Sequence, residues 1–328
     1  MSQSNVSAVV PCRNECDHIE TCLQSILAQE PLEVIVADGM SDDGTREILD
    51  RLARTDARLR IVDNPKRITP AGMNAGIHAA QGKFIAIMGA HQRYAPDYLR
   101  CSIEALEQTG ADNVGGAMFC EADTWLQGVI AAAHHSPFSV GGARWHNPNY
   151  EGPADTVFGG VYRREIFARI GLFDEQLARN QDDELNFRLI RAGGKIWQSP
   201  AIRSWYRPRG SLVALFRQYR QYGYWKVRVI QKHRMPASWR HLVPATFVLL
   251  LILLPVLSIR AWLVLLVAYL VGNVGASILT AARYGWGLLP ALPAVFACYH
   301  FGYGWGFLLG IRDLNRAPSP SFTELTRT

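Results

Sequence analysis

Short apolar runs alternate with helical periodicities along the first 90 residues. Four runs have the pattern of buried strands, at residues 7–10, 32–37, 59–62 and 84–88. Between them, apolar residues recur at the spacing of one helix face, over residues 15–29, 46–55 and 71–80. Strands that alternate with helices through short turns predict an α/β fold, with a mostly parallel sheet and helices on both faces.

The ends of these four strands carry the first functional signal. Each is followed by polar or charged residues with Gly or Pro nearby, at 11–15, 38–43, 63–67 and 89–91. Ligands of parallel sheets bind beyond the carboxyl ends of the strands. No GxGxxG or Walker-type loop follows the first strand, so neither a dinucleotide nor a kinase-like phosphate cradle is predicted. A nucleotide held by an acid such as Asp38 fits better, although Asp before Gly39 is equally typical of a turn.

The C-terminal third has a different pattern. From residue 241 to 310 the chain is almost wholly apolar, and Arg260 and Arg283 are its only fully charged residues. Segments 242–258 and 261–282 approach the roughly 20 residues that cross a bilayer, with Arg260 at a tight hairpin. Segment 288–310 is a third candidate, broken by two prolines and four glycines. Three crossings would put the arginines after it outside, against the positive-inside tendency, and two crossings with a re-entrant segment would keep them inside.

Charge and aromatic content point to the same membrane. The net charge of +6 could indicate nucleic acid. However, the cations crowd residues 217–240, where a membrane protein keeps its cytoplasmic positive charge. Residues 204–232 mix these cations with aromatics, as in an amphipathic helix in the headgroup layer, with helical core packing as the alternative. The first residues lack the positive start of a signal peptide, so we expect a cytoplasmic domain in a multi-pass protein of the plasma (inner) membrane.

We therefore expect four regions. Residues 1–210 form the globular α/β domain, 211–240 the interfacial segment, 241–311 the membrane domain and 312–328 a polar tail. The six cysteines are scattered without a CxxC pair, so free thiols in a reduced compartment are expected. Cys12, Cys16 and His18 do not have the ligand number or spacing of a structural zinc site.

Three consecutive acids, Asp182, Asp183 and Glu184, precede an apolar-periodic run. Carboxylates are favoured in the first turn of a helix, so these residues alone indicate only a helix start. Other motifs in the chain change this interpretation. Several motifs in this order resemble family 2 inverting glycosyltransferases, and most of all the succinoglycan-biosynthesis glucosyltransferases. They are VVPCRNE at 9–15, DGMSDDGT at 38–45, NAG at 74–76, FGGVYRRE at 158–165, GLFDE at 171–175 and QDDEL at 181–185.

The resemblance covers residues 6–224 and implies a GT-A fold, a nucleotide-sugar donor (a UDP-sugar), a divalent metal and single displacement with inversion. It implies that Asp182 is the general base, with Asp183 as the alternative. Residues implied to bind the nucleotide-sugar are Pro11, Arg13, Glu15, Asp38, Lys66, Arg67 and Gly89. Residues implied on the acceptor side are Gly159, Gly160 and Trp225. The relatives also carry an apolar C-terminal part, as this chain does.

The chain departs from the family at the fourth strand end. The usual Asp-x-Asp is replaced there, with Gly89 in place of the first acid and His91 at the metal-ligand position. Imidazole suits Mn²⁺ better than Mg²⁺, so Mn²⁺ is favoured, with Asp155 or Glu184 as an added carboxylate ligand. The expected function is transfer of a sugar to a lipid-linked or membrane-proximal acceptor in bacterial exopolysaccharide or glycolipid synthesis. The rivals are a catalytically weak homologue that scaffolds an assembly complex, and a nucleic-acid binder, against which the membrane segments and the missing recognition motifs argue.

Overall fold

The computed structural model describes residues 5–142, 146–236 and 238–323. The chain forms two compact units. The first contains residues 1–120 and 144–206, and the second contains residues 121–143 and 207–328. Residues 121–143, predicted to belong to the globular α/β domain, group with the C-terminal residues in the structure.

The first unit is built on a sheet whose described strands follow the order β3-β2-β1-β4-β9-β6-β10-β8. Strands β1 to β4 are parallel, as expected, and the bounds are Val6–Cys12, Glu33–Asp38, Leu59–Asp63 and Phe84–Ile87. β9 (Phe158–Arg163) runs antiparallel between β4 and β6. The far side holds β6 (Asn113–Gly116), β10 (Ile196–Gln198) and β8 (Gly152–Pro153). A small second sheet contains β5 (Gln92–Tyr94), β11 (Ser204–Tyr206) and β7 (Met118–Cys120).

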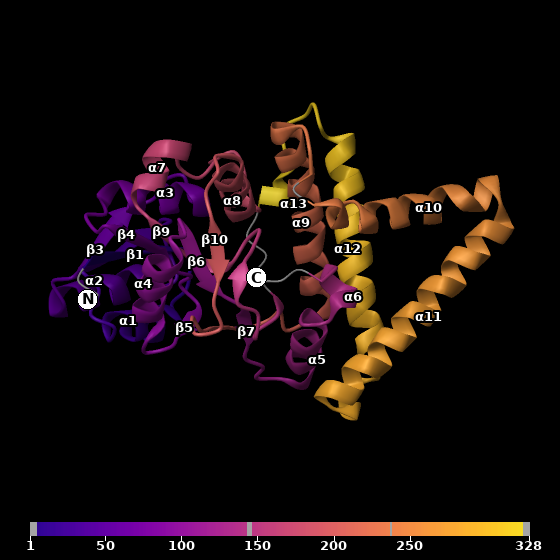
Figure 1. The fold of residues 1–328 in the computed structure, drawn as a ribbon, viewed down its shortest axis with the longest axis horizontal. Coiled ribbons are helices and arrows are strands. Elements are labelled where there is room, and N and C mark those ends of the chain that lie inside the picture. Colours follow the sequence, from indigo (N-terminus) through magenta and orange to yellow (C-terminus); the bar gives the residue numbers. More distant parts are fainter. Residues whose placement is uncertain (1–4, 143–145, 237, 324–328) are drawn as a thin grey trace. The chain divides into compact units, whose positions relative to one another are not determined.

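Helices cover both faces of the large sheet (Figure 1). Val10 and Val36 pack on one face with Leu23 and Ile26, in the cluster that also holds buried residues of α2 and α4. The intervening strand positions, such as Ile35, pack on the other face in a cluster with residues of α3, α7 and α8. This alternation is the period of two of a strand. The helices are α1 (Ile19–Leu27), α2 (Thr45–Thr55), α3 (Thr69–Ala79), α4 (Tyr98–Thr109), α7 (Glu165–Ile170) and α8 (Gln181–Arg191).

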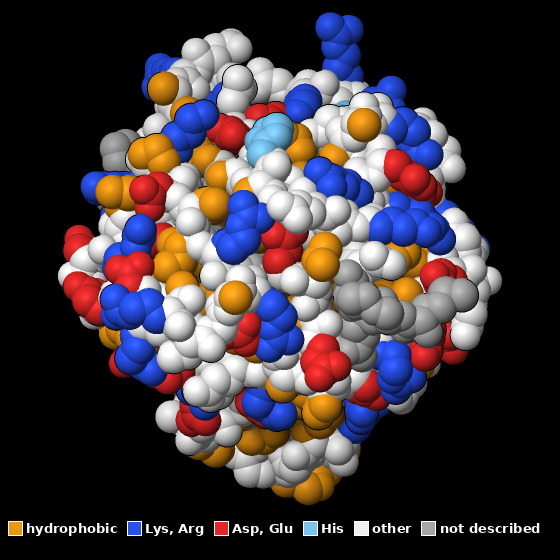
Figure 2. Space-filling model, turned by 90° about the vertical axis from the view of Figure 1, so that its left-hand side faces the viewer, with side chains coloured by type: hydrophobic (Ala, Val, Ile, Leu, Met, Phe, Trp, Pro, Cys, Tyr) orange, Lys and Arg blue, Asp and Glu red, His pale blue; other side chains and the backbone are white. Residues whose placement is uncertain are grey.

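One face of the first unit carries the mixed side chains expected of a surface in contact with water. Figure 2 shows the face on the left-hand side of Figure 1, where acidic and basic side chains are interspersed and hydrophobic ones lie in separate small groups. Mixed charges without a large apolar area are typical of a domain in water. The strand order and the helices packed on both faces of the large sheet confirm the predicted α/β architecture.

The second unit is helical. Its helices are α5 (Trp125–His134), α6 (Pro137–Val140), α9 (Leu212–His233), α10 (Val243–Leu257), α11 (Ile259–Tyr284), α12 (Leu292–Arg312) and α13 (Pro320–Thr323). In the part of the chain that the structure describes, three segments are long and apolar enough to span a membrane: Trp239–Leu257, Ile259–Tyr284 and Leu292–Arg312. α10 and α11 expose large apolar side chains, including Val256 at 89% and Leu279 at 74%. Apolar exposure of this extent is typical of contact with lipid.

Residues 121–143 join this unit through apolar packing. Val129, Ile130 and Ala133 of α5 pack in one buried cluster with Leu292 and Phe296 of α12. α5 begins with a capping box in which the Thr124 hydroxyl accepts the Gln127 N–H and the Gln127 side chain reaches back. Amphipathic α5 therefore has its apolar partner in a helix that lies about 160 residues later in the chain.

The C-terminal segment returns to α9. Phe322 is 4% exposed and stacks on Tyr224 with ring centroids 3.8 Å apart. The Trp225 indole N–H donates to the Phe322 carbonyl at 2.9 Å, and Gln221 Nε2 donates to the Ser321 carbonyl at 3.3 Å. The polar tail expected from residue 312 onward thus contains, in its described part, an ordered and partly buried stretch.

Candidate active site

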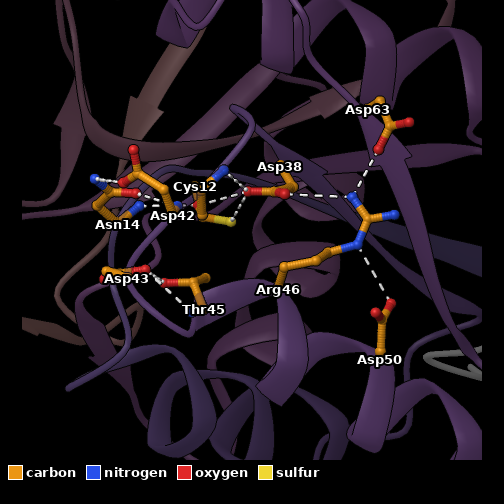
Figure 3. Close-up of polar contacts among 10 residues, drawn as sticks. Cys12, Asn14, Asp38, Asp42, Asp43, Thr45, Arg46, Asp50 and Asp63 are labelled. Carbon is orange, nitrogen blue, oxygen red and sulfur yellow. Dashed lines mark hydrogen bonds and ion pairs between the residues drawn. The ribbon is translucent and has the colours of Figure 1, made fainter.

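The turn after β2 is built around the carboxylate of Asp38, which is 1% exposed (Figure 3). Its Oδ1 accepts the hydroxyl of Ser41 at 2.6 Å and the Ser41 backbone N–H at 3.2 Å. Its Oδ2 lies 3.3 Å from Nη1 of Arg46. Both oxygens of the Asp38 carboxylate therefore contact groups of the protein itself. A direct contact with a nucleotide stays a prediction.

Arg46 links the ends of two parallel strands (Figure 3). Its guanidinium lies 2.7 Å from Asp63 at the end of β3, and 3.3 Å from both Asp38 and Asp50. The hydrogen bond that Arg46 donates to Asp63 raises the pKa of Arg46 above its ordinary value. Burial opposes this effect, and the other two carboxylates add to it. Arg46 follows the DGMSDDGT motif directly and was not among the predicted site residues.

Asp43 joins the turn after β2 to the turn after β1. Its Oδ1 accepts the backbone N–H and the hydroxyl of Thr45, at 3.0 and 2.6 Å, and its Oδ2 accepts the Cys16 N–H at 3.2 Å. The Thr45 hydroxyl in turn accepts the Glu15 N–H at 2.8 Å. Burial alone would raise the pKa of Asp43, but the hydrogen bonds outweigh it and lower the pKa to about 2. These contacts fix the backbone that carries Glu15.

Glu15 and His91 meet across the ends of β1 and β4. Oε1 of Glu15 lies 3.0 Å from Nδ1 of His91, and both side chains are largely buried, at 11% and 23% exposed. The His91 ring also contacts Tyr206 edge-on, with centroids 6.0 Å apart, and Tyr206 contacts Phe158 at the start of β9. The predicted metal residue and the predicted donor residue Glu15 therefore form one pair.

The place of the missing acid at Gly89 is taken by Gln92. A Cβ on Gly89 would lie 2.6 Å from Nε2 of Gln92. The side-chain oxygen Oε1 of Gln92 accepts the Tyr94 hydroxyl at 2.6 Å, which holds the side-chain amide in position. The Gly89 carbonyl accepts the Cys22 thiol at 3.3 Å. The space that a side chain at position 89 would occupy is thus filled by Gln92, and the Gly89 backbone is hydrogen-bonded.

The other predicted donor residues lie at the same strand ends. Pro11 pairs with Ala37 in the sheet, and Arg13 crosses Gly39, where an added Cβ would lie 3.0 Å from the Arg13 Cβ. Lys66 forms an ion pair with Glu175, which lowers the pKa of Glu175. Arg67 is exposed and has positive φ, +58°. Two cations therefore follow β3, one of them paired with a carboxylate.

Asn74 ties together two of the sequence motifs. Its Nδ2 donates to the Phe173 carbonyl at 2.9 Å and its Oδ1 accepts the Phe173 N–H at 3.0 Å. Nδ2 also lies 3.0 Å from Glu175, the partner of Lys66. The GLFDE segment is therefore held against α3, beside the cations that follow β3.

The three acids at the start of α8 have different surroundings. Asp182 is exposed and Asp183 is half-buried. Glu184 is fully buried and is held by Arg188, with 2.8 Å between its Oε2 and Nη2. Arg188 also donates to the carbonyls of Ile170 and Leu172. Glu184 therefore supports the 170–172 turn through Arg188, and a role as metal ligand stays a prediction.

α8 contacts β9 through a buried polar network. Asn186 accepts the Asn113 amide at 3.0 Å and donates to Thr156 at 2.9 Å. The Tyr162 hydroxyl of β9 also reaches Asn186, at 3.4 Å. Burial, and after it the charge of Asp182, raises the pKa of Tyr162. This network anchors the N-terminal turn of α8 against β9.

The acceptor-side predictions fall in two places. Gly159 has φ +59°, and its carbonyl accepts the Tyr98 hydroxyl at 2.6 Å. A Cβ on Gly160 would lie 2.5 Å from the Asn113 side chain, so no larger residue fits beside the network. Trp225 belongs to the second unit, is 2% exposed and binds the C-terminal segment. Its acceptor role stays a prediction.

The fold and this strand-end site define a class, the GT-A type glycosyltransferases. A solved structure with this architecture, a mannosyltransferase from Pyrobaculum calidifontis in complex with GDP-Man and Mn²⁺, aligns with a TM-score of 0.60 at 19% identity. The alignment covers 94% of this chain and 87% of that one.

The sequence profile of Glycosyl transferase family 2 matches residues 7–171, and the chain belongs to this family. It is 32% identical to succinoglycan biosynthesis protein ExoA of Rhizobium meliloti, over 94% of this chain and 95% of that protein. It is 28% identical to a dolichyl N-acetyl-alpha-D-glucosaminyl phosphate 3-beta-D-2,3-diacetamido-2,3-dideoxy-beta-D-glucuronosyltransferase of Methanococcus voltae, over 93% and 97%. The chain is therefore a glycosyltransferase, and the predicted resemblance and GT-A fold are confirmed.

The donor set tests whether a divalent ion fits. No group of three or more His, Cys, Asp or Glu side chains that could hold a metal occurs within residues 5–142, 146–236 and 238–323. The Glu15–His91 pair nevertheless has the form of a ligand with its supporting carboxylate: one ring nitrogen faces a carboxylate, which directs the other toward a metal. One imidazole together with a substrate diphosphate suits Mn²⁺. The residues fit an ion that the substrate helps to hold.

Proposed function

We propose that this glycosyltransferase moves a sugar from a UDP-sugar to a lipid-linked acceptor at the cytoplasmic face of the plasma membrane, with inversion at the anomeric carbon. One relative is named as a transferase for a dolichyl phosphate-linked sugar and another for succinoglycan biosynthesis. Together with the membrane helices, these names support a lipid-linked acceptor and a role in exopolysaccharide or glycolipid synthesis.

The observation that carries the mechanism is the contrast within the first turn of α8. Glu184 is locked by Arg188, whereas Asp182 is exposed beside β9. A base must reach the hydroxyl of its substrate, and of these two carboxylates Asp182 is the accessible one. The buried Asn186 network holds the helix that carries it.

Asp182 accepts the proton of the acceptor hydroxyl as that oxygen forms a bond to the anomeric carbon. The bond from this carbon to the diphosphate oxygen breaks, and the nucleoside diphosphate leaves with the electron pair. A divalent cation, when bound, supplies charge stabilisation on the leaving diphosphate. His91 would hold it through Nε2, because Nδ1 faces Glu15, and Lys66 and Arg67 add positive charge at the same edge.

A transfer assay with the full chain in lipid nanodiscs tests this function. A panel of UDP- and GDP-sugars is supplied with membrane lipid extract, and the anomeric configuration of the product is read by NMR. We expect one UDP-sugar to be consumed with inversion. Retention of configuration would overturn the single-displacement mechanism. No turnover with any sugar would favour the rival function, a membrane scaffold.

A further inference from the structure

Helix α12 runs parallel to α9 in fixed register. The Cys298 thiol contacts the Leu212 carbonyl at 3.7 Å, and Arg228 Nη1 donates to the Leu314 carbonyl at 2.7 Å; both pairs are 86 residues apart. Between these ends, a Cβ on Gly306 would lie 1.9 Å from the Arg220 carbonyl oxygen. The two helices therefore stay in contact over about 24 Å, at 1.5 Å per residue.

The same register holds at each turn between these ends. A Cβ on Gly302 would lie 2.9 Å from the Phe216 carbonyl oxygen, and one on Gly310 would lie 2.8 Å from that of Tyr224. Three glycines at a spacing of four thus let α12 touch the backbone of α9 directly. Neither helix can change its depth in a membrane without the other.

α9 cannot stand across a bilayer. Its length carries five cations: Arg217, Arg220, Lys226, Arg228 and Lys232. In a membrane-spanning orientation the central ones would lie near the middle of the hydrocarbon, where cations are strongly disfavoured. Because α12 shares the depth of α9 along this stretch, it does not cross the bilayer there either.

The first half of α12 is bound to elements that cannot cross. Trp125 of α5 donates its indole N–H to the Gly287 carbonyl at 3.1 Å, just before α12. His300, midway along α12, lies 2.7 Å from the Phe138 carbonyl of α6. α5 has ten residues and α6 four, both too short to span, and the chain around them returns at each end to the sheet unit.

Burial separates α12 from the other two apolar helices. We compared the most apolar 18-residue stretch of each helix. In this stretch 11% of the residues are buried for Trp239–Leu257 and 17% for Ile259–Tyr284, against 50% for Leu292–Arg312. α10 and α11 run away from the parallel pair α9–α12 and return to it as a hairpin (Figure 1). The hairpin has the exposure expected in lipid, and α12 has that of a packed, half-covered helix.

We propose that α9 and α12 lie together in the headgroup layer of an anionic membrane, as one interfacial platform, and that only α10 and α11 cross the bilayer. The exposed cations Arg217, in α9, and Arg234, just after its end, then meet lipid phosphates, while Val227 packs against Gly310 of α12. The segment after α12 ends on the same side as the sheet unit. This inference holds whichever sugar and acceptor the enzyme uses.

Single-cysteine additions to the full chain test the number of crossings. Arg260→Cys places a thiol at the α10–α11 connection and Ala317→Cys places one after α12, both at exposed positions. A membrane-impermeant maleimide is applied to intact cells and to permeabilised cells, and the unsubstituted chain gives the background of its own cysteines. We expect Arg260→Cys to react in intact cells and Ala317→Cys only after permeabilisation.

Either of two results would overturn the proposed topology. Reaction of Ala317→Cys in intact cells would show a third crossing. Failure of Arg260→Cys to react in intact cells would show that the hairpin does not cross at all.

The anionic surface is tested by the lipids that copurify with the protein. We expect Arg217→Gln/Arg234→Gln to lose at least half of the enrichment of phosphatidylglycerol over phosphatidylethanolamine, measured by mass spectrometry. Arg260→Gln, which removes a cation at the far end of the hairpin, should keep that enrichment. An unchanged ratio in the double variant would overturn the anionic part of the proposal.

Discussion

At the scale of single residues, the first turn of α8 gives neighbouring carboxylates different surroundings. Asp182→Asn keeps the shape and removes the basicity, so we expect turnover to fall by about 10² or more while donor binding persists. Transfer rates and calorimetry with UDP measure the two effects. Asp183→Asn is the matched control and should retain most of the activity. The reverse order of the two variants would move the base to Asp183.

The pair formed by Glu15 and His91 gives a second prediction at this scale. Glu15→Gln should weaken Mn²⁺ binding in the presence of UDP by about 10- to 100-fold, because the carboxylate orients the imidazole. His91→Ala should abolish it. Electron paramagnetic resonance of free Mn²⁺ measures binding without turnover. His18→Ala, just before α1, is the control, and equal Mn²⁺ affinity in Glu15→Gln and the unsubstituted chain would contradict an orienting role.

Asp38 shows how far single residues could be predicted. Its place at the end of a parallel strand followed from the pattern of the sequence, because the period of the strand and the turn after it are local. Its partner Arg46 did not, because the ion pair depends on how α2 lies across β2 and β3. Gln92, which takes the space beside Gly89, was missed for the same reason: the contact forms only when the chain folds back after β4.

At the scale of elements, the turns after β1 and β2 are joined by a carboxylate whose charge matters. The pKa of Asp43 lies near 2 in the folded chain, below its ordinary value of 3.8. Its contribution to stability is therefore present above about pH 4 and is lost as the pH falls toward 2. Asp43→Asn should lower the free energy of unfolding at pH 6, and with it the thermal midpoint. The loss should stay under about 1 kcal/mol, since the group is exposed.

Thermal unfolding of Asp43→Asn and of the unsubstituted chain at pH 6, 4 and 3 tests this prediction. The difference between the two chains should shrink over the lower part of this range, because there the unfolded chain binds a proton at Asp43 while the folded chain, with its lower pKa, does not. Asp42→Asn, next in the same turn, controls for the general effect of removing a charge. A constant difference at all three pH values would show that charge on Asp43 is not the cause.

The contact between α9 and α12 gives a sharper prediction. Gly306→Ala should destabilise the protein by about 1–3 kcal/mol or more, because the new methyl group meets the backbone of Arg220 and neither helix can give way. Gly275→Ala on α11, where a Cβ meets nothing within 4 Å, should be neutral or stabilising by up to about 1 kcal/mol. Thermal unfolding in detergent compares them, and equal effects would contradict the close backbone contact.

The hydrophobic periodicity predicted where helices and strands lie in the chain better than which elements pack together. The apolar run and helical spacing of residues 7–88 placed four strands and three helices close to their observed bounds. β9 was not predicted as a strand, because its FGGVYR sequence carries two glycines where strands are usually rich in branched residues. The end of α10 at Leu257, with Ser258 capping α11, came two residues before the predicted hairpin at Arg260.

At the scale of the whole molecule, the interleaved order of the two units changes what a truncation would do. A chain that ends at Arg209 keeps α5 and α6 but lacks α12, so Val129, Ile130 and Ala133 lose their apolar partners. We expect this fragment to aggregate. Replacing residues 121–143 with a short Gly/Ser linker in the same fragment should restore a monomer that binds UDP. Size-exclusion chromatography and calorimetry compare the two fragments, and a monomeric first fragment would contradict the prediction.

The position of α5 and α6 in the chain also has a consequence for synthesis on the ribosome. Their partner α12 is translated about 160 residues later, which takes roughly 8 to 30 seconds at 5–20 residues per second. During that interval the sheet formed by the residues on either side of 121–143 can already fold, while the apolar face of α5 stays exposed to solvent. Slow elongation or delayed insertion of the α10–α11 hairpin would lengthen this interval. The order of the helices in the chain thus makes the yield of folded enzyme depend on the pace of its translation.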